Sequence, residues 1–169
     1  MKTIYLDMDG VVADWQVRVA EIVGRPLPEG ERWPDEDWRS LIEFQRLYSE
    51  LPLMRDARYL VNQCQLLARA HAYDVKFLTA VPRRNDFPWA FQDKVHWANK
   101  YFPSIPVWLG PYSEDKQKRS GPGQVLIDDR VTNCAQWRDR GGWAWQYLGD
   151  AKPALEALSH YLSTDPVSL

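Results

Sequence analysis

Two carboxylates follow the first apolar run of the chain. Ile4, Tyr5 and Leu6 have the pattern of a short buried strand, and Asp7 and Asp9 come directly after it. Burying an unpaired charge is costly, and two like charges beside each other cost more. The sequence therefore predicts a positive group at this strand end, most simply a metal ion.

Other polar residues occupy similar places later in the chain. Thr79 ends the apolar run VKFLT, and Asp128 and Asp129 end the run QVLIDD, while Lys116 and Lys118 lie in the loop before that run. In an open parallel sheet, ligands bind at the carboxyl ends of the strands. We therefore expect these side chains to share one rim with Asp7 and Asp9.

The residue types at this rim indicate which chemistry they could support. Carboxylate oxygens suit Mg²⁺, which prefers carboxylates, water and phosphate oxygens. The three histidines are isolated and the two cysteines lie far apart, which argues against zinc. A hydroxyl and an ammonium directed at one point could neutralise a phosphoryl group during its transfer. The rim therefore predicts Mg²⁺-assisted phosphoryl chemistry.

Bulk composition limits the remaining function classes. The 169 residues carry a formal net charge of −2, which predicts one domain and no nucleic-acid polymer as partner. No apolar run is long enough to cross a bilayer, and neither a signal peptide nor a disulfide framework is expected. We expect a cytoplasmic protein, with a homodimer as one open alternative. The chain has nine tryptophans. We expect most of them to fill the core, and some could instead line a pocket for a flat ligand.

The elements that must position the rim residues alternate between short apolar runs and helical stretches. This pattern predicts an α/β fold, Rossmann-like, with three α/β/α layers and a mainly parallel sheet. A helical insertion over residues 15–54 breaks the alternation after the first strand. The expected strands are Lys2–Asp7, Val75–Thr79, Pro106–Gly110, Gln124–Asp129 and Trp143–Tyr147. The expected helices are Trp15–Val23, Trp38–Leu47, Ala57–Ala70, Phe87–Tyr101, Val131–Arg140 and Lys152–Leu162.

Four motifs in order resemble those of the haloacid dehalogenase-like phosphatase superfamily. They are DMDGV at 7–11, Thr79 in FLTA, a lysine within 116–118 and IDD at 127–129. Within the superfamily the chain is most similar to the 5′(3′)-deoxyribonucleotidases, through DMDGVVADW, DKVHWANKYFP at 93–103, SEDK and VLIDDR. The resemblance implies a core over 1–14 and 55–169 and a small helical cap over 15–54.

The resemblance also implies a role for each rim residue. Asp7 would be the nucleophile that forms a phosphoaspartate, and Asp9 the general acid and base. Thr79 would donate to a phosphate oxygen. The metal would be held by Asp7, by Asp9 through its backbone carbonyl, and by Asp129, with Asp128 as its neighbour. The implied activity is Mg²⁺-dependent removal of phosphate from (deoxy)nucleoside monophosphates.

Two lysines compete for the third motif. Lys116 matches by its SEDK context and Lys118 by its distance to Asp128, and Lys116 is preferred. Ala80 stands in the substrate-binding segment where the family has a serine after the second-motif threonine. Arg83 and Arg84 could add phosphate contacts.

Aromatic residues after the first motif suggest a wall for a nucleobase. Trp15 matches an aromatic residue of the resembled family, and Trp33 or Trp38 could face it across a pocket. Two other functions stay open at this point. They are a phosphatase of the same fold for another small phosphorylated metabolite, and a non-catalytic binding protein on this scaffold.

Overall fold

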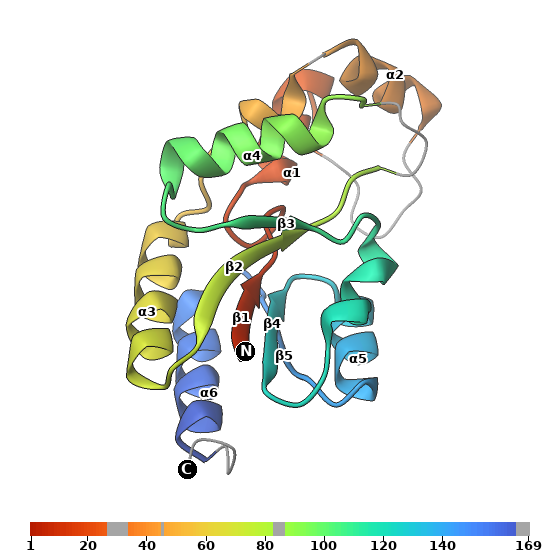
Figure 1. Ribbon diagram of the computed structural model, residues 1–169. Helices are drawn as coiled ribbons and strands as arrows, with labels where there is room; N and C mark the ends of the chain where they lie inside the picture. Colours follow the sequence, from red (N-terminus) through yellow and green to blue (C-terminus); the bar gives the residue numbers. More distant parts are fainter. Residues whose placement is uncertain (27–33, 45, 83–86, 165–169) are drawn as a thin grey trace.

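The central sheet of the computed structural model contains five strands, and residues 1–26, 34–44, 46–82 and 87–164 are described. The strands are β1 (Thr3–Leu6), β2 (Asp74–Thr79), β3 (Val107–Leu109), β4 (Gln124–Asp128) and β5 (Trp143–Gln146). They lie in the order β3-β2-β1-β4-β5, and every neighbouring pair is parallel (Figure 1). The predicted parallel α/β sheet is confirmed.

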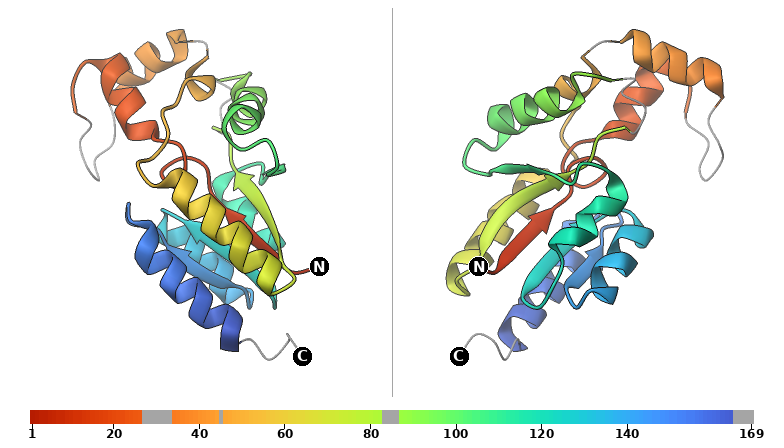
Figure 2. Two further views of the ribbon diagram at one scale, coloured as in Figure 1. Left: turned by 90° about the vertical axis from the view of Figure 1, so that its left-hand side faces the viewer. Right: turned by 45° about the vertical axis from the view of Figure 1, so that its right-hand side comes forward.

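Helices cover both faces of the sheet, as the three-layer prediction requires. The helices are α1 (Trp15–Val23), α2 (Asp35–Glu43), α3 (Ala57–Ala70), α4 (Ala90–Tyr101), α5 (Val131–Asp139) and α6 (Ala151–Thr164). Two short 3₁₀ helices are η1 (Leu47–Ser49) and η2 (Ser113–Arg119). Figures 1 and 2 show α3 and α6 on one face of the sheet and α5 with η2 on the other.

The central strand β1 is buried on both sides, so it ends deep inside the molecule. Ile4 and Leu6 belong to the larger core, whereas Tyr5 packs with Leu126 and Trp137 on the other face. The rings of Tyr5 and Trp137 meet edge to face, with centroids 5.5 Å apart. Because β1 is enclosed in this way, whatever follows Leu6 is held in a fixed position at the upper edge of the sheet.

Residues 15–54 leave and rejoin the rest of the chain at one place. The Asp14 N–H donates to the Pro52 carbonyl at 2.8 Å, and the Met54 N–H donates to the Val12 carbonyl at 2.9 Å. The helices of this segment lie above the carboxyl ends of the strands (Figure 1). The indole N–H of Trp97 in α4 donates to the Leu51 carbonyl at 2.7 Å. The end of the segment is thus fastened to α4.

Some predicted element boundaries are wrong. The helix predicted over Trp38–Leu47 is α2, which begins at Asp35 and ends at Glu43, and Leu47 belongs to η1. The helix predicted from Phe87 begins at Ala90, and the loop predicted after β3 contains η2. In the described part of the chain, no helix is both long and apolar enough to cross a membrane.

Candidate active site

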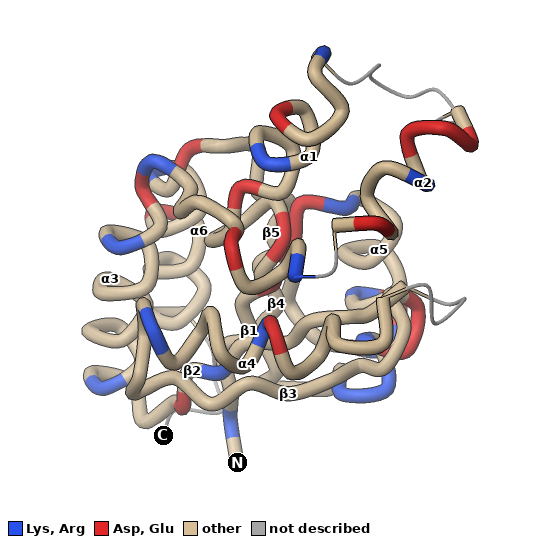
Figure 3. Tube along the Cα trace, turned by 90° about the horizontal axis from the view of Figure 1, so that it is seen from above, with Lys and Arg blue, Asp and Glu red and all other residues tan. Residues whose placement is uncertain are grey.

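Three neighbouring strands bring the predicted rim residues to one edge of the sheet. Asp7 directly follows β1, Thr79 is the last residue of β2, and Asp128 is the last residue of β4. The Asp7 N–H still donates to the Ile127 carbonyl, at 2.9 Å, so Asp7 is held beside β4. Figure 3, which looks down on this edge, shows acidic segments around the ends of the strands.

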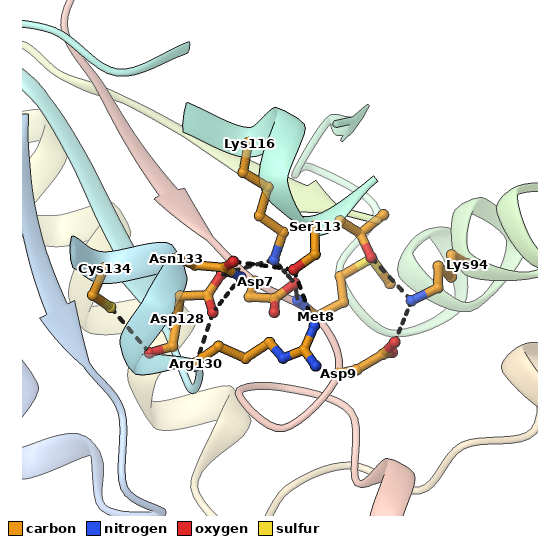
Figure 4. A network of polar contacts seen from close by, with 11 residues as sticks. Asp7, Met8, Asp9, Lys94, Ser113, Lys116, Asp128, Arg130, Asn133 and Cys134 are labelled. Carbon is orange, nitrogen blue, oxygen red and sulfur yellow. Dashed lines mark hydrogen bonds and ion pairs between the residues drawn. The ribbon is translucent and has the colours of Figure 1, made fainter. Parts of the chain in front are cut away.

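Lys116 of η2 lies between two of the carboxylates (Figure 4). Its Nζ is 2.7 Å from Asp7 Oδ1 and 2.7 Å from Asp128 Oδ2, and the residue is only 2% exposed. Burial disfavours its charge, but the two carboxylates outweigh burial and raise the pKa of Lys116. Lys118 lies elsewhere: its Nζ pairs with Asp115 at 2.6 Å, and its side chain is 70% exposed. The structure therefore brings Lys116, and not Lys118, to the carboxylates.

Asp128 is fully buried, and both of its carboxylate oxygens accept hydrogen bonds. Asn133 Nδ2 lies 2.9 Å from Oδ1 and 3.1 Å from Oδ2, and the Arg130 N–H donates to Oδ1 at 2.9 Å. Together with Lys116, these donors fix the position of the Asp128 carboxylate. Because both oxygens of Asp128 already accept hydrogen bonds, this carboxylate is better suited to orient its neighbours than to bind a ligand.

Asp129 approaches the turn after Asp7 closely. A Cβ atom added at Gly10 would lie 2.6 Å from Asp129 Oδ2, well inside van der Waals contact. Gly10 also has a φ of 78°, in the left-handed region that favours glycine. Glycine is therefore required at position 10 for the first and fourth motifs to meet.

The carboxylates form a group that could hold a divalent cation. One oxygen from each of Asp7, Asp128 and Asp129 lies within 4.8 Å of the others. Burial raises the pKa of Asp7, and the neighbouring carboxylates raise it further while Lys116 opposes them. An all-oxygen donor set of this kind fits Mg²⁺, whose charge would relieve the repulsion. The side chain of Asp9 lies outside this group.

Lys94 of α4 is a site residue that the sequence analysis missed. It is 1% exposed, its Nζ pairs with the Asp9 carboxylate, and it donates to Thr79 Oγ1 at 3.0 Å (Figure 4). The same Nζ lies 4.5 Å from the centroid of the Tyr48 ring. One feature of the sequence could have revealed it. Lys94 falls on the same helix face as Ala90, Trp97 and Ala98, which are buried. A lysine on an apolar helix face needs a buried partner.

A cavity of about 500 Å³ opens beside these residues. It is large enough for a small organic ligand. Its lining includes the acidic residues Asp7, Asp9 and Asp129, the cation Lys116, Ala80, and the aromatic residues Trp15, Trp38, Tyr48 and Tyr112. The predictions for Trp33, Arg83 and Arg84 concern residues outside the described ranges. Most of the predicted carboxylates, Lys116 and two of the predicted tryptophans thus line one space, whereas Thr79 and Lys118 are not part of its lining.

Comparison with protein families gives one match over most of the chain. Residues 1–148 match the family described as 5′ nucleotidase, deoxy (pyrimidine), cytosolic type C protein. The chain belongs to this family. It is accordingly a haloacid dehalogenase-like hydrolase of the phosphatase and nucleotidase type, as the order of its four motifs predicted. A comparison with curated proteins gives no match.

Solved structures resemble this nucleotidase-family chain in fold. The HAD-hydrolase YfnB from Bacillus subtilis, solved with magnesium, has 16% identity and a TM-score of 0.52, covering 95% of this chain and 98% of its own. A haloacid dehalogenase-like hydrolase from Streptococcus pneumoniae has 14% identity and a TM-score of 0.51, covering 93% and 90%. At these identities the likeness establishes the fold.

Proposed function

We propose that this protein is a Mg²⁺-dependent 5′(3′)-deoxyribonucleotidase that removes phosphate from (deoxy)nucleoside monophosphates. One observation carries the proposal: a single cavity joins Asp7, Lys116 and Asp129 to the rings of Trp15 and Trp38. A nucleoside monophosphate has a phosphate at one end and a flat base at the other, and this lining matches both. The family match supports the same substrate class.

Asp7 is the proposed nucleophile. Its carboxylate would attack the phosphorus atom, form a phosphoaspartate and release the nucleoside, and water would then hydrolyse the acyl phosphate. Lys116 contacts Asp7 Oδ1, and the Met8 N–H donates to the same oxygen at 2.8 Å. These two donors leave Asp7 Oδ2 for the attack. Lys116 favours the ionised form of Asp7 that the attack needs, against burial, which raises the pKa of Asp7.

Asp9 is the proposed general acid and base. Within the described part of the chain Asp9 Oδ1 has no hydrogen-bond partner, whereas Oδ2 pairs with Lys94. Oδ1 is therefore the oxygen that could give a proton to the leaving alkoxide and later take one from water. Lys94 and Thr79 would place a cation and a hydroxyl near the transferred phosphate. Both groups would reduce the cost of its negative charge.

The proposed cofactor is Mg²⁺, held by the carboxylates of Asp7 and Asp129 with Asp128 orienting them, and by the backbone carbonyl of Asp9. When bound, it would neutralise negative charge on the phosphate oxygens during transfer. Asp128 would keep Lys116 and the turn at Arg130 in place, because its oxygens are already bound by them. We assign Asp129 the direct metal contact for that reason.

Residues 15–54 are proposed to act as a small cap that supplies the base-binding wall. Trp15 begins α1 and Trp38 lies in α2, and both line the cavity. Ala80 also lines it, so the wall beside Thr79 lacks a serine hydroxyl. We propose that the protein works in the cytoplasm, in line with the cytosolic type named for its family.

A phosphate-release screen tests this function. We expect the purified protein with Mg²⁺ to hydrolyse deoxynucleoside monophosphates faster than sugar phosphates of similar size. The D7N variant should have no measurable turnover, because an amide cannot act as the nucleophile, while D139N on the exposed end of α5 should match the wild type. Faster turnover of sugar phosphates would favour the general small-phosphate alternative, and near-normal activity of D7N would exclude the mechanism.

A further inference from the structure

A second cavity lies on the face of the sheet that carries α5 and η2. Its volume is about 410 Å³, and it shares no lining residue with the active-site cavity. The strands contribute Thr3 and Tyr5 from β1, Lys76 from β2 and Trp108 from β3. The end of η2 and the turn after it contribute Lys118, Arg119, Ser120, Gly121 and Pro122. We refer to this cavity as the basic groove.

Two cations meet on one ring in the basic groove. Lys76 Nζ lies 4.7 Å and Arg119 Cζ 3.9 Å from the centroid of the Trp108 ring. An aromatic face attracts each of them, but the two like charges repel each other. The arrangement is therefore one that an anion between or beside the two cations would stabilise.

The acidic residues near the basic groove do not balance its charge. No carboxylate belongs to its lining, and Arg119 has no carboxylate partner among the described residues. Lys76 is 3.5 Å from Asp74, and the exposed Lys118 pairs with Asp115. Arg119 therefore keeps an uncompensated guanidinium, whose fork of N–H donors suits phosphate oxygens.

We propose that the basic groove binds an oligophosphate, meaning two or more linked phosphoryl groups. Lys76 and Arg119 meet on Trp108, and Lys118 belongs to the same lining, so several cations face one groove. A chain of phosphoryl groups carries several negative charges within a short length, which matches this group of cations. The oligophosphate is either free or the tail of a nucleoside diphosphate. The site is separate from the proposed active site, so its failure would leave the nucleotidase proposal unaffected.

Binding of inorganic pyrophosphate, measured by calorimetry at low salt without Mg²⁺, tests the affinity. We expect the double variant K76Q/R119Q to bind at least about tenfold more weakly than the wild type. The matched control is R58Q/K100Q, because Arg58 and Lys100 also share one ring, that of Tyr101, outside the basic groove. The control should stay within about twofold. Equal losses in both double variants, or no saturable binding at all, would overturn the proposal.

The position of the bound anion is tested by the indole N–H signals in a proton–nitrogen spectrum, assigned with W108F and W15F. Pyrophosphate in the basic groove should shift the Trp108 signal, whether or not the active-site cavity also binds it. A shift of the Trp15 signal without one of the Trp108 signal would overturn the proposal. ADP separates the two sources of the ligand. In both cases the binding should weaken in K76Q/R119Q. If ADP and pyrophosphate bind with equal affinity, the groove recognises the phosphates alone. If ADP binds more tightly, the groove also recognises the nucleoside.

Discussion

A few buried charges determine what the candidate site can do. Asp7, Asp128 and Lys116 are each at most 5% exposed, and each ion pair among them is 2.7 Å long. Charges so far from water interact strongly. The two carboxylates favour the charged form of Lys116, and Lys116 in turn favours the ionised form of Asp7. Removing one of them should therefore cost far more than removing a charge on the surface.

The two lysines of η2 allow that contrast to be measured. We expect K116A to lower kcat by about 10²–10³-fold, the typical effect of losing one preorganised donor. K118A should stay within about fivefold, because an exposed ion pair contributes little. The measurement is phosphate release from a deoxynucleoside monophosphate at saturating Mg²⁺, with circular dichroism as a check of folding. Equal and mild effects at both positions would mean that neither lysine reaches the phosphate.

Lys94 is the site residue that the sequence analysis missed, and its role can be tested directly. If it orients Asp9 for proton transfer, K94M should reduce kcat about 10–100-fold for substrates whose leaving oxygen needs a proton. Phenyl phosphate and 4-nitrophenyl phosphate are matched in shape but differ in the basicity of the leaving oxygen. We expect a large loss with the first and a small loss with the second.

Two outcomes would reject the positioning role of Lys94. An equal loss with both esters would mean that Lys94 acts on the phosphate or on the fold, and not on the proton transfer by Asp9. A K94R variant that keeps the cation but recovers nothing beyond stability would mean a purely structural role. Sequence reasoning missed this lysine because its partners are distant in the chain. Asp9 is 85 residues away and Thr79 is 15 residues away.

At the scale of elements, the strands were the best predicted part of the fold. Their short apolar runs form a parallel sheet whose central strands β1 and β4 are buried, and the predicted and observed bounds agree within one residue. The start of α2 was missed because Asp35, Glu36 and Asp37 look like a polar loop. They form the first turn of a helix after Pro34, where acidic side chains favour the N-terminus.

The 3₁₀ helix η2 was missed for a different reason. Its seven residues, SEDKQKR, are all polar and have no apolar period. Its position is set instead by contacts with other elements: Lys116, in its middle, is buried against Asp7 and Asp128, and Arg119, at its end, lies over Trp108. Only the folded sheet supplies those partners, so no local sequence pattern could have revealed η2.

Helix α1 carries the clearest prediction about substrate choice. If the Trp15 ring stacks on a base, W15A should lower kcat/KM for a deoxynucleoside monophosphate about ten- to a hundredfold, the equivalent of about 1–3 kcal/mol. It should barely change kcat/KM for ethyl phosphate, whose leaving group is too small to reach the ring. The measurement is the ratio of these two values in W15A and in the wild type. A loss shared equally by both substrates would mean that Trp15 only packs α1 against the core.

At the scale of the whole molecule, α4 connects the sheet with the segment over 15–54. Besides the hydrogen bond from Trp97 to Leu51, Arg46 pairs with the buried Asp93. Tyr48 packs edge to face on Phe87, with ring centroids 5.7 Å apart. These contacts tie η1 and its flanks to the core, while α1 and α2 extend beyond them (Figure 2). Arg18 of α1 pairs in turn with Glu50, which directly follows η1, so α1 is joined to the same region.

The acidic cluster links metal binding to the stability of the entire fold. Burial, followed by neighbouring carboxylates, raises the pKa of Asp7, and the same causes raise that of Asp129 to about 6. A carboxyl group whose pKa is higher in the folded than in the unfolded state stabilises the fold at low pH. That stability is lost as the pH rises through the folded-state pKa. Without metal, the cluster should therefore destabilise the protein more at pH 8 than at pH 5.

Added Mg²⁺ should reverse this effect, because only ionised carboxylates bind it well. At a concentration of about 100 times Kd, we expect Tm to rise by roughly 5–10 °C at pH 8, and by much less at pH 5. Differential scanning fluorimetry with EDTA or Mg²⁺ at the two pH values measures the difference. D129N should abolish the rise at pH 8, whereas D139N should retain it. An equal rise in Tm at both pH values, or one that survives in D129N, would show that Mg²⁺ stabilises the protein somewhere other than at Asp7 and Asp129.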